Sequence, residues 1–184
     1  MTTIAIIAIV IALAIAAVLI YAAMRPDTFR IERTKHINAS PEQIWPLIFD
    51  LKEHHAWSPF EKDPNMKRTH SGAASGPGSV YEWSGNREVG AGKLELVGAT
   101  PVSRLQMKLH MYKPMKALND VEFILVPNGS GTDFTWSMRG PQPYMAKLFG
   151  TFVDCDKMCG NMFDEGLGKL NALAEKPMLR GNAA

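Results

Sequence analysis

The chain has 184 residues, and its 20 Lys and Arg against 18 Asp and Glu leave a formal net charge of only +2. This balance, with no basic patch of interleaved aromatic residues, argues against a nucleic acid partner. Two cysteines make neither a disulfide framework nor a complete structural zinc site. The length predicts one domain with a short extra element at one end.

The first predicted element is an apolar segment from Ile4 to Ala23, which contains no charged residue, Gly or Pro. At 1.5 Å rise per residue, a helix of this length spans about 30 Å, the thickness of a bilayer's hydrocarbon core. The segment predicts a transmembrane helix, with residues 1–25 as a membrane anchor. A cleaved signal peptide is the alternative, because YAA at 21–23 could be cut. Against it, residues 1–3 carry no positive charge and the apolar run is long.

Four basic residues follow the apolar segment at short intervals: Arg25, Arg30, Arg33 and Lys35. By the positive-inside rule, basic residues next to a spanning helix stay on the cytoplasmic side. We therefore expect the C-terminal domain in the cytoplasm, where reduced cysteines also fit.

A strand and two short helices are predicted next. Apolar and charged residues begin to alternate at Phe29, in the manner of a strand. Ser40 fits a helix N-cap, and Gln43 completes a capping box with it. Pro46 should kink this helix or end it early. A second short helix is expected over residues 50–57.

Alternating segments between Ser79 and Arg139 predict an antiparallel meander of about five strands, over residues 79–83, 92–99, 104–112, 120–126 and 132–138. In 104–112 the alternation is cleanest, so one face of this strand is apolar and the other is wet. The Gly-rich segment 71–79 is predicted to be a loop.

One long amphipathic helix is predicted from Tyr144 to Glu175. Its apolar and small residues recur at steps of three and four, and therefore share one face. The residues of this face are Met145, Leu148, Phe152, Cys155, Cys159, Met162 and Gly166. Both cysteines are thus expected inside, as core or cavity wall. Metal or redox chemistry is the alternative, although two thiols alone leave a metal site incomplete.

Together these elements predict an α+β fold, in which a curved antiparallel sheet wraps around the long C-terminal helix and one transmembrane helix precedes both. The domain should span residues 26–176, with a tail at 177–184. A sheet and a helix in this arrangement often enclose an apolar cavity of the kind that ligands use.

A resemblance to a known family rests on three segments: FRIERTKHINASPEQIW at 29–45, HAWSPFEKDPNMKRTHSG at 55–72 and GTDFTWSMRGPQP at 131–143. They are similar to the SRPBCC superfamily of START-like helix-grip proteins, and within it to the bacterial polyketide cyclase/dehydrase group. The resemblance runs from about Thr28 to Glu175. It implies a helix-grip fold with a cavity for a hydrophobic ligand, but it does not specify the ligand or any chemistry.

The leading expectation is a single-pass protein of the bacterial inner membrane that binds a lipid, isoprenoid or quinone. The expected ligand contacts are Trp57, Tyr81, Trp83, Met107, Leu109, Met111, Phe123, Trp136, Met138, Phe149, Phe152, Cys155, Cys159 and Met162. One alternative is a cyclase- or dehydratase-like enzyme with His54, Tyr81 or an acidic group as acid or base. Another is a non-catalytic partner-binding module. No cofactor, metal or catalytic residue is assigned, because no nucleophile or paired-carboxylate signature stands out.

Overall fold

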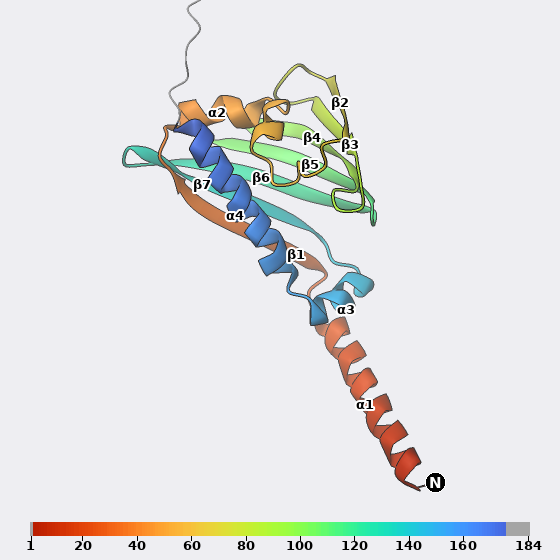
Figure 1. The fold of residues 1–184 in the computed structure, drawn as a ribbon. Helices are drawn as coiled ribbons and strands as arrows, with labels where there is room; N and C mark the ends of the chain where they lie inside the picture. Colours follow the sequence, from red (N-terminus) through yellow and green to blue (C-terminus); the bar gives the residue numbers. More distant parts are fainter. Residues whose placement is uncertain (1, 176–184) are drawn as a thin grey trace, which may run out of the picture.

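The computed structural model describes residues 2–175, and its centre is one curved, seven-stranded antiparallel sheet (Figure 1). The strand order is β1-β7-β6-β5-β4-β3-β2. The strands are β1 (Thr28–Ile37), β2 (Lys67–Gly72), β3 (Ser79–Ser84), β4 (Ala91–Thr100), β5 (Arg104–Lys113), β6 (Ala117–Asn128) and β7 (Gly131–Pro141). The helices are α1 (Thr2–Met24), α2 (Pro41–Phe49), the 3₁₀ helix η1 (Glu53–Ala56), α3 (Tyr144–Phe152) and α4 (Cys155–Ala174). The predicted α+β helix-grip architecture is confirmed.

All six predicted strands are present, and the structure adds β2, which the sequence prediction missed. Residues 67–72 are exposed along their whole length, so they lack the apolar alternation that marks a half-buried strand. Pairing with β3 makes this segment a strand, and the hairpin turn between them begins at Gly72, whose φ is +77°. A residue with a side chain rarely adopts this φ.

The predicted start and early end of the first helix of the domain, α2, are also confirmed. The backbone N–H of Ser40 donates to Oε1 of Gln43 at 2.8 Å, as a capping box requires. Pro46 lies inside α2, which ends three residues later at Phe49. The second predicted helix, over 50–57, is reduced to the single turn of η1.

The prediction of one long helix from Tyr144 to Glu175 is wrong, because the chain breaks at Val153 and Asp154. Val153 is extended, with φ −122° and ψ 127°. The Asp154 carboxylate then accepts a hydrogen bond from the backbone N–H of Lys157 at 2.9 Å, which makes it the N-cap of α4. As a result α3 packs against α1, and α4 alone crosses the sheet (Figure 1).

An ion pair on β1 fixes α4 on the sheet. Arg33 Nη2 lies 2.9 Å from Oδ2 of Asp156, and Arg33 Nε lies 3.6 Å from Asp164. The guanidinium reaches them by crossing Gly160, where a Cβ would come within 1.8 Å of Nη2. This contact places α4 over the β1 side of the sheet.

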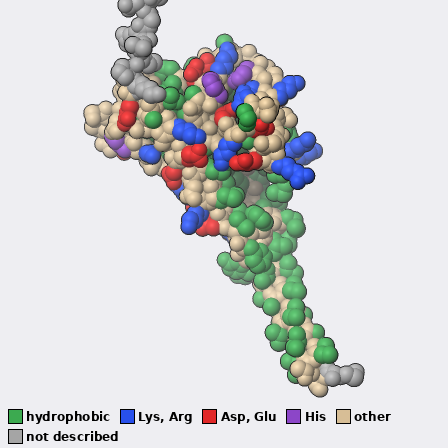
Figure 2. All heavy atoms as spheres, in the orientation of Figure 1, with side chains coloured by type: hydrophobic (Ala, Val, Ile, Leu, Met, Phe, Trp, Pro, Cys, Tyr) green, Lys and Arg blue, Asp and Glu red, His purple; other side chains and the backbone are tan. Residues whose placement is uncertain are grey.

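The helix α1 projects away from the domain, and apolar side chains cover its surface (Figures 1 and 2). In the described part of the chain it is the one helix long and apolar enough to cross a membrane, a property that signal sequences share. The predicted tail at 177–184 lies outside the described residues.

Candidate ligand-binding site

The inner face of the sheet, defined here as the face that packs against α4, carries rows of side chains that run across the strands. One such row contains Leu96, Met107, Val121, Met138 and Ile31. Because side chains alternate between the two faces of a strand, every second residue contributes to these rows. The predicted ligand contacts on the strands therefore do share one face.

The centre of the inner face is filled by aromatic rings in direct contact. The ring of Trp136 lies parallel to that of Phe163 on α4, with centroids 4.3 Å apart. Trp57 and Phe123 meet Trp136 edge-on at 5.7 and 5.3 Å. Gly166 permits this approach, since a Cβ there would lie 3.0 Å from the Trp136 ring. This part of the inner face is packed core.

Two surface hollows lie elsewhere. The larger, of about 390 Å³, is on the outer face of the sheet. Most of its charges are paired within the hollow: Arg104 with Glu122, and Lys108 and Arg139 with Asp120. The smaller, of about 120 Å³, adjoins the β2–β3 hairpin. Neither hollow lies between the sheet and α4, where the sequence predicts a cavity.

The most open apolar part of the inner face is its end nearest α1, where β1 begins and β7 ends (Figure 1). We call it the anchor-end surface. Its side chains come from five strands and are all half-buried: Phe29, Trp83, Leu94, Leu109, Met111 and Met138. They remain partly open because α4 packs chiefly against β1. These half-buried apolar side chains at the edge of the core make this surface the candidate site.

Asn119 is the polar residue in the floor of the anchor-end surface. It pairs with Leu109 on β5, and its side chain lies over Gly140, where a Cβ would come within 2.0 Å of Oδ1. Asn119 is 6% exposed, and its Oδ1 has no hydrogen-bond partner among the described residues. Such an unsatisfied buried group costs about 1–3 kcal/mol. Nε1 of Trp136 is also buried without a hydrogen-bond partner among residues 2–175.

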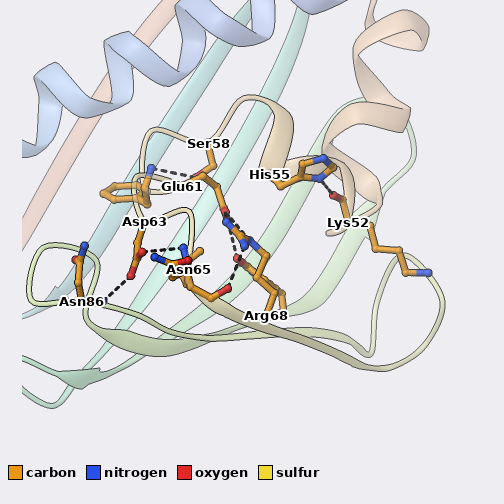
Figure 3. A network of polar contacts seen from close by, with 11 residues as sticks. Lys52, His55, Ser58, Glu61, Asp63, Asn65, Arg68 and Asn86 are labelled. Carbon is orange, nitrogen blue, oxygen red and sulfur yellow. Dashed lines mark hydrogen bonds and ion pairs between the residues drawn. The ribbon is translucent and has the colours of Figure 1, made fainter.

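The loop between η1 and β2 bridges the inner face from the core to the β2–β3 edge. At one end Phe60 contacts the ring of Trp136, with centroids 6.3 Å apart. At the other end Glu61 accepts a hydrogen bond from the Tyr81 hydroxyl of β3. Glu61 also pairs with Arg68 of β2, with 2.7 Å between Nη2 and Oε2 (Figure 3). These contacts hold the loop in place on both sides.

The two carboxylates of this loop, Glu61 and Asp63, are both engaged. Glu61 uses Oε1 for Tyr81 and Oε2 for Arg68. Burial, and then the hydrogen bond to Glu61, raise the pKa of Tyr81 well above its usual range. Asp63 accepts from the backbone N–H groups of Asn65 and Asn86 at 2.9 and 2.8 Å (Figure 3). These contacts attach the loop to the sheet and have a structural role.

His54 and His55 point to different sides, as predicted. His54 is buried, its Nε2 donates to the backbone oxygen of Ile48 at 2.9 Å, and its ring packs on Trp57. Burial lowers the pKa of His54 to about 4. A group with this pKa, turned into the core, is poorly placed for proton transfer near neutral pH.

Cys155 and Cys159 are free thiols, both half-buried on α4. Burial, followed by the nearby Cys155 and Asp156, raises the pKa of Cys159. A raised pKa leaves little of the thiolate that metals and electrophiles require. Within residues 2–175, no group of three His, Cys, Asp or Glu side chains could hold a metal ion. Cys159, which packs against the core, thus has the surroundings of a small hydrophobic residue.

The predicted ligand contacts fall into three groups. Those buried in the domain are Trp57, Tyr81, Met107, Phe123 and Trp136. Those half-buried are Trp83, Leu109, Met111, Met138, Cys155, Cys159 and Met162. Phe149 and Phe152 are exposed on α3, so their predicted place on the sheet-facing side of one long helix is wrong. The break at Asp154 turns them away from the sheet.

Sequence reasoning missed Asn119 as a site residue. It precedes Val121, Phe123 and Leu125 at even spacing, so it occupies the same face as these buried residues. A polar residue in register with core positions is the signal that identifies it, because a buried amide needs a partner.

The profile of a family described as "Polyketide cyclase / dehydrase and lipid transport" matches residues 28–175, which excludes α1. No protein of curated function matches the sequence significantly. Among solved structures, protein MLL2253 from Mesorhizobium loti is similar over 82% of this chain and 100% of its own, with 17% identity and a TM-score of 0.60. The Aha1 dimer from Colwellia psychrerythraea is similar over 80% of this chain and 97% of its own, with 16% identity and a TM-score of 0.57. CV1439 from Chromobacterium violaceum is similar over 82% of this chain and 99% of its own, with 16% identity and a TM-score of 0.56. At these identities the likeness shows the fold alone.

Proposed function

Because the chain belongs to the polyketide cyclase/dehydrase and lipid transport family, we propose that it binds a hydrophobic small molecule that carries one polar group. The ligand would lie on the anchor-end surface, with its apolar part against the half-buried side chains there. Lipids and isoprenoid alcohols carry such a group as a hydroxyl, and quinones carry it in their reduced, quinol form. The observation that carries the proposal is Asn119, whose Oδ1 is unpaired in the floor of this surface.

The amide of Asn119 supplies the polar contact. A ligand hydroxyl or N–H that displaced the groups covering Oδ1 could donate to it, which would recover a hydrogen bond that the protein lacks. Few polar groups in an otherwise apolar site are typical of sites for small hydrophobic ligands. Binding rather than catalysis is supported by the engagement of Tyr81, Glu61 and His54 in contacts within the protein.

We further propose that α1 stays on the mature protein as a membrane anchor. The contacts of its last turns support retention over cleavage: Tyr144 donates to the backbone oxygen of Leu19 at 3.1 Å, and Ala22, within the possible cleavage sequence, is fully buried. An anchor would hold the binding domain close to a reservoir of apolar ligand, which raises the ligand's effective concentration.

The basic residues after α1 favour the cytoplasmic side of a bacterial inner membrane for the domain. A reporter active only in the periplasm, fused after Ala184, should therefore be inactive, while a cytoplasmic reporter at the same position should be active. Periplasmic activity with α1 intact would reverse the orientation. Release of a soluble, shortened chain would instead identify α1 as a signal peptide.

Native mass spectrometry with organic extraction tests ligand binding directly. The domain truncated to begin at Asp27 suits this experiment, because the three solved structures named above are covered over 97–100% of their length and the family match starts at residue 28. We expect a discrete bound small molecule after incubation with a total membrane lipid extract.

A mass that stays that of the free protein would contradict the ligand proposal. That result would favour the alternative of a partner-binding module, which is also consistent with the packed aromatic centre. A bound molecule lighter by one water than a component of the extract would indicate a dehydratase.

A further inference from the structure

The helix α3 presents an apolar face that no part of the described chain covers. Met145, Phe149 and Phe152 are 69%, 56% and 73% exposed. At spacings of four and three residues they lie on one side of the helix. Lys147, on the opposite side, is only 6% exposed. A short helix is thus turned with its charge inward and its large apolar side chains outward.

The inward side of α3 is fixed to the end of α1. Tyr144 donates to the backbone oxygen of Leu19 at 3.1 Å, and Arg25 Nη1 donates to the backbone oxygen of Lys147 at 3.2 Å. Lys147 Nζ also pairs with Oδ1 of Asp27 at 2.6 Å. These bonds come from the last turns of α1 and the connector after it, so α3 has a defined position relative to α1.

Gly150 lets the connector lie close against α3, since a Cβ there would come within 2.8 Å of Arg25 Nη1. The end of α1, which α3 contacts, also has an apolar surface, on which Ile20, Tyr21 and Met24 are exposed. Figure 2 shows a run of apolar side chains from α1 to the base of the domain.

The length of α1 sets the depth of α3. A helix of 23 residues is about 35 Å long, whereas the hydrocarbon core is about 30 Å thick. About one turn of a spanning α1 therefore extends into the headgroup region. The contacts with α3 begin at Leu19 and end at Asp27, which places α3 at the boundary between acyl chains and headgroups. Aromatic side chains are enriched at this level.

We propose that α3 is an interfacial helix, with Met145, Phe149 and Phe152 inserted into the surface of the bilayer that α1 spans. The inference rests on the anchor proposed above. Lipid is the occupant that fits, because α3 contacts the end of α1 and its face lies at the depth where a bilayer surface must be. Burial of such a face a few ångströms into the headgroup boundary is the usual mode of amphipathic helices.

This position gives the domain one orientation at the membrane. The helix α3 follows β7 in the chain. Near its end, β7 lies against the Asn119 side chain at Gly140. With α3 in the interface, the anchor-end surface faces the bilayer. A ligand could then pass between the membrane and this surface over a short distance, which favours a membrane lipid or another bilayer-soluble compound as the ligand.

Lipid contact can be measured with the full chain in phosphatidylcholine and phosphatidylglycerol vesicles. Cys155 and Cys159 are replaced by alanine, and the environment-sensitive fluorophore NBD is attached after Phe149→Cys, or after Val97→Cys as the control. Val97 is also an exposed apolar residue, 46% exposed, but it lies on β4. Doxyl-labelled lipids should quench the fluorophore at position 149 and leave the one at position 97 unchanged.

Flotation of the same vesicles after a carbonate wash reports on α1 independently. Protein that floats, with no quenching at position 149, would overturn the interfacial role of α3 and leave the anchor standing. A blue-shifted fluorophore at 149 without lipid quenching would show a protein, such as a second copy, on this face, and would also overturn it. Failure to float would reject the anchor itself.

Discussion

Replacement of Asn119 by leucine is expected to weaken ligand binding by about tenfold or more while the domain becomes more stable. The variant removes the amide that we assign to the ligand's polar group, and one lost hydrogen bond in a buried site costs about 1.5 kcal/mol or more. It also removes an unpaired buried oxygen, so the free energy of unfolding should rise by about 1 kcal/mol. The measurements are a binding titration with the extracted ligand and urea unfolding.

This pair of effects separates a binding role from a structural one. If Asn119 were needed for the fold, its substitution would destabilise the domain. If it serves binding and its polarity is unfavourable in the free protein, the substitution should stabilise the domain. Asn161→Leu is the matched control, since Asn161 is exposed on α4 and should change neither quantity. Unchanged affinity in Asn119→Leu would remove Asn119 from the proposed site.

Acidification is expected to reduce the stability of the domain through His54. Burial holds the pKa of His54 at about 4, whereas the residue titrates near 6.5 in the unfolded chain. Between these values the unfolded state binds more protons than the folded state, so stability falls as the pH falls. The full contribution is about 3 kcal/mol, on the scale of 1.36 kcal/mol per pKa unit. Urea unfolding at about pH 7.5 and pH 4.5 measures it.

His54→Gln should flatten this dependence, because glutamine can still donate to the backbone oxygen of Ile48 but does not titrate. The neighbouring His55 is exposed and provides the control: His55→Gln should keep the slope of the parent protein. Equal slopes in all three proteins would show that His54 is not the group responsible. Carboxylates with lowered pKa, such as Asp120, affect all three alike at lower pH.

The proposed binding surface and the proposed interfacial helix are linked by covalent connection. β7 contributes Met138 to the anchor-end surface, and the next element in the chain is α3. A change in the depth of α3 would therefore move one side of the site with it.

The sequence by itself determined the elements that depend on local pattern. The uncharged segment from Ile4 to Ala23 forms α1, because nothing in it breaks a helix. The alternation in 104–112 forms β5, and the Ser40–Gln43 capping box begins α2. Each of these signals lies within a few residues of the element that it predicts, so no tertiary contact is needed to recognise it.

Tertiary structure decided the features in which distant residues compete for the same space. β2 exists because β3 offers it a hydrogen-bonding edge, although its own six residues lack an apolar pattern. A periodic apolar face from 144 to 166 predicts one helix, but capping at Asp154 and the contacts of α3 with α1 divide it.

The candidate site depends on tertiary structure even more strongly. Alternation assigns Trp136 and Leu109 to the same face of the sheet, but it does not say which of them α4 covers. That is decided by the close approach at Gly166, which buries Trp136 under Phe163, and by the Arg33 contacts that hold α4 over β1. Local sequence thus determines which face a side chain occupies, and the packing of distant elements determines how far it remains open to a ligand.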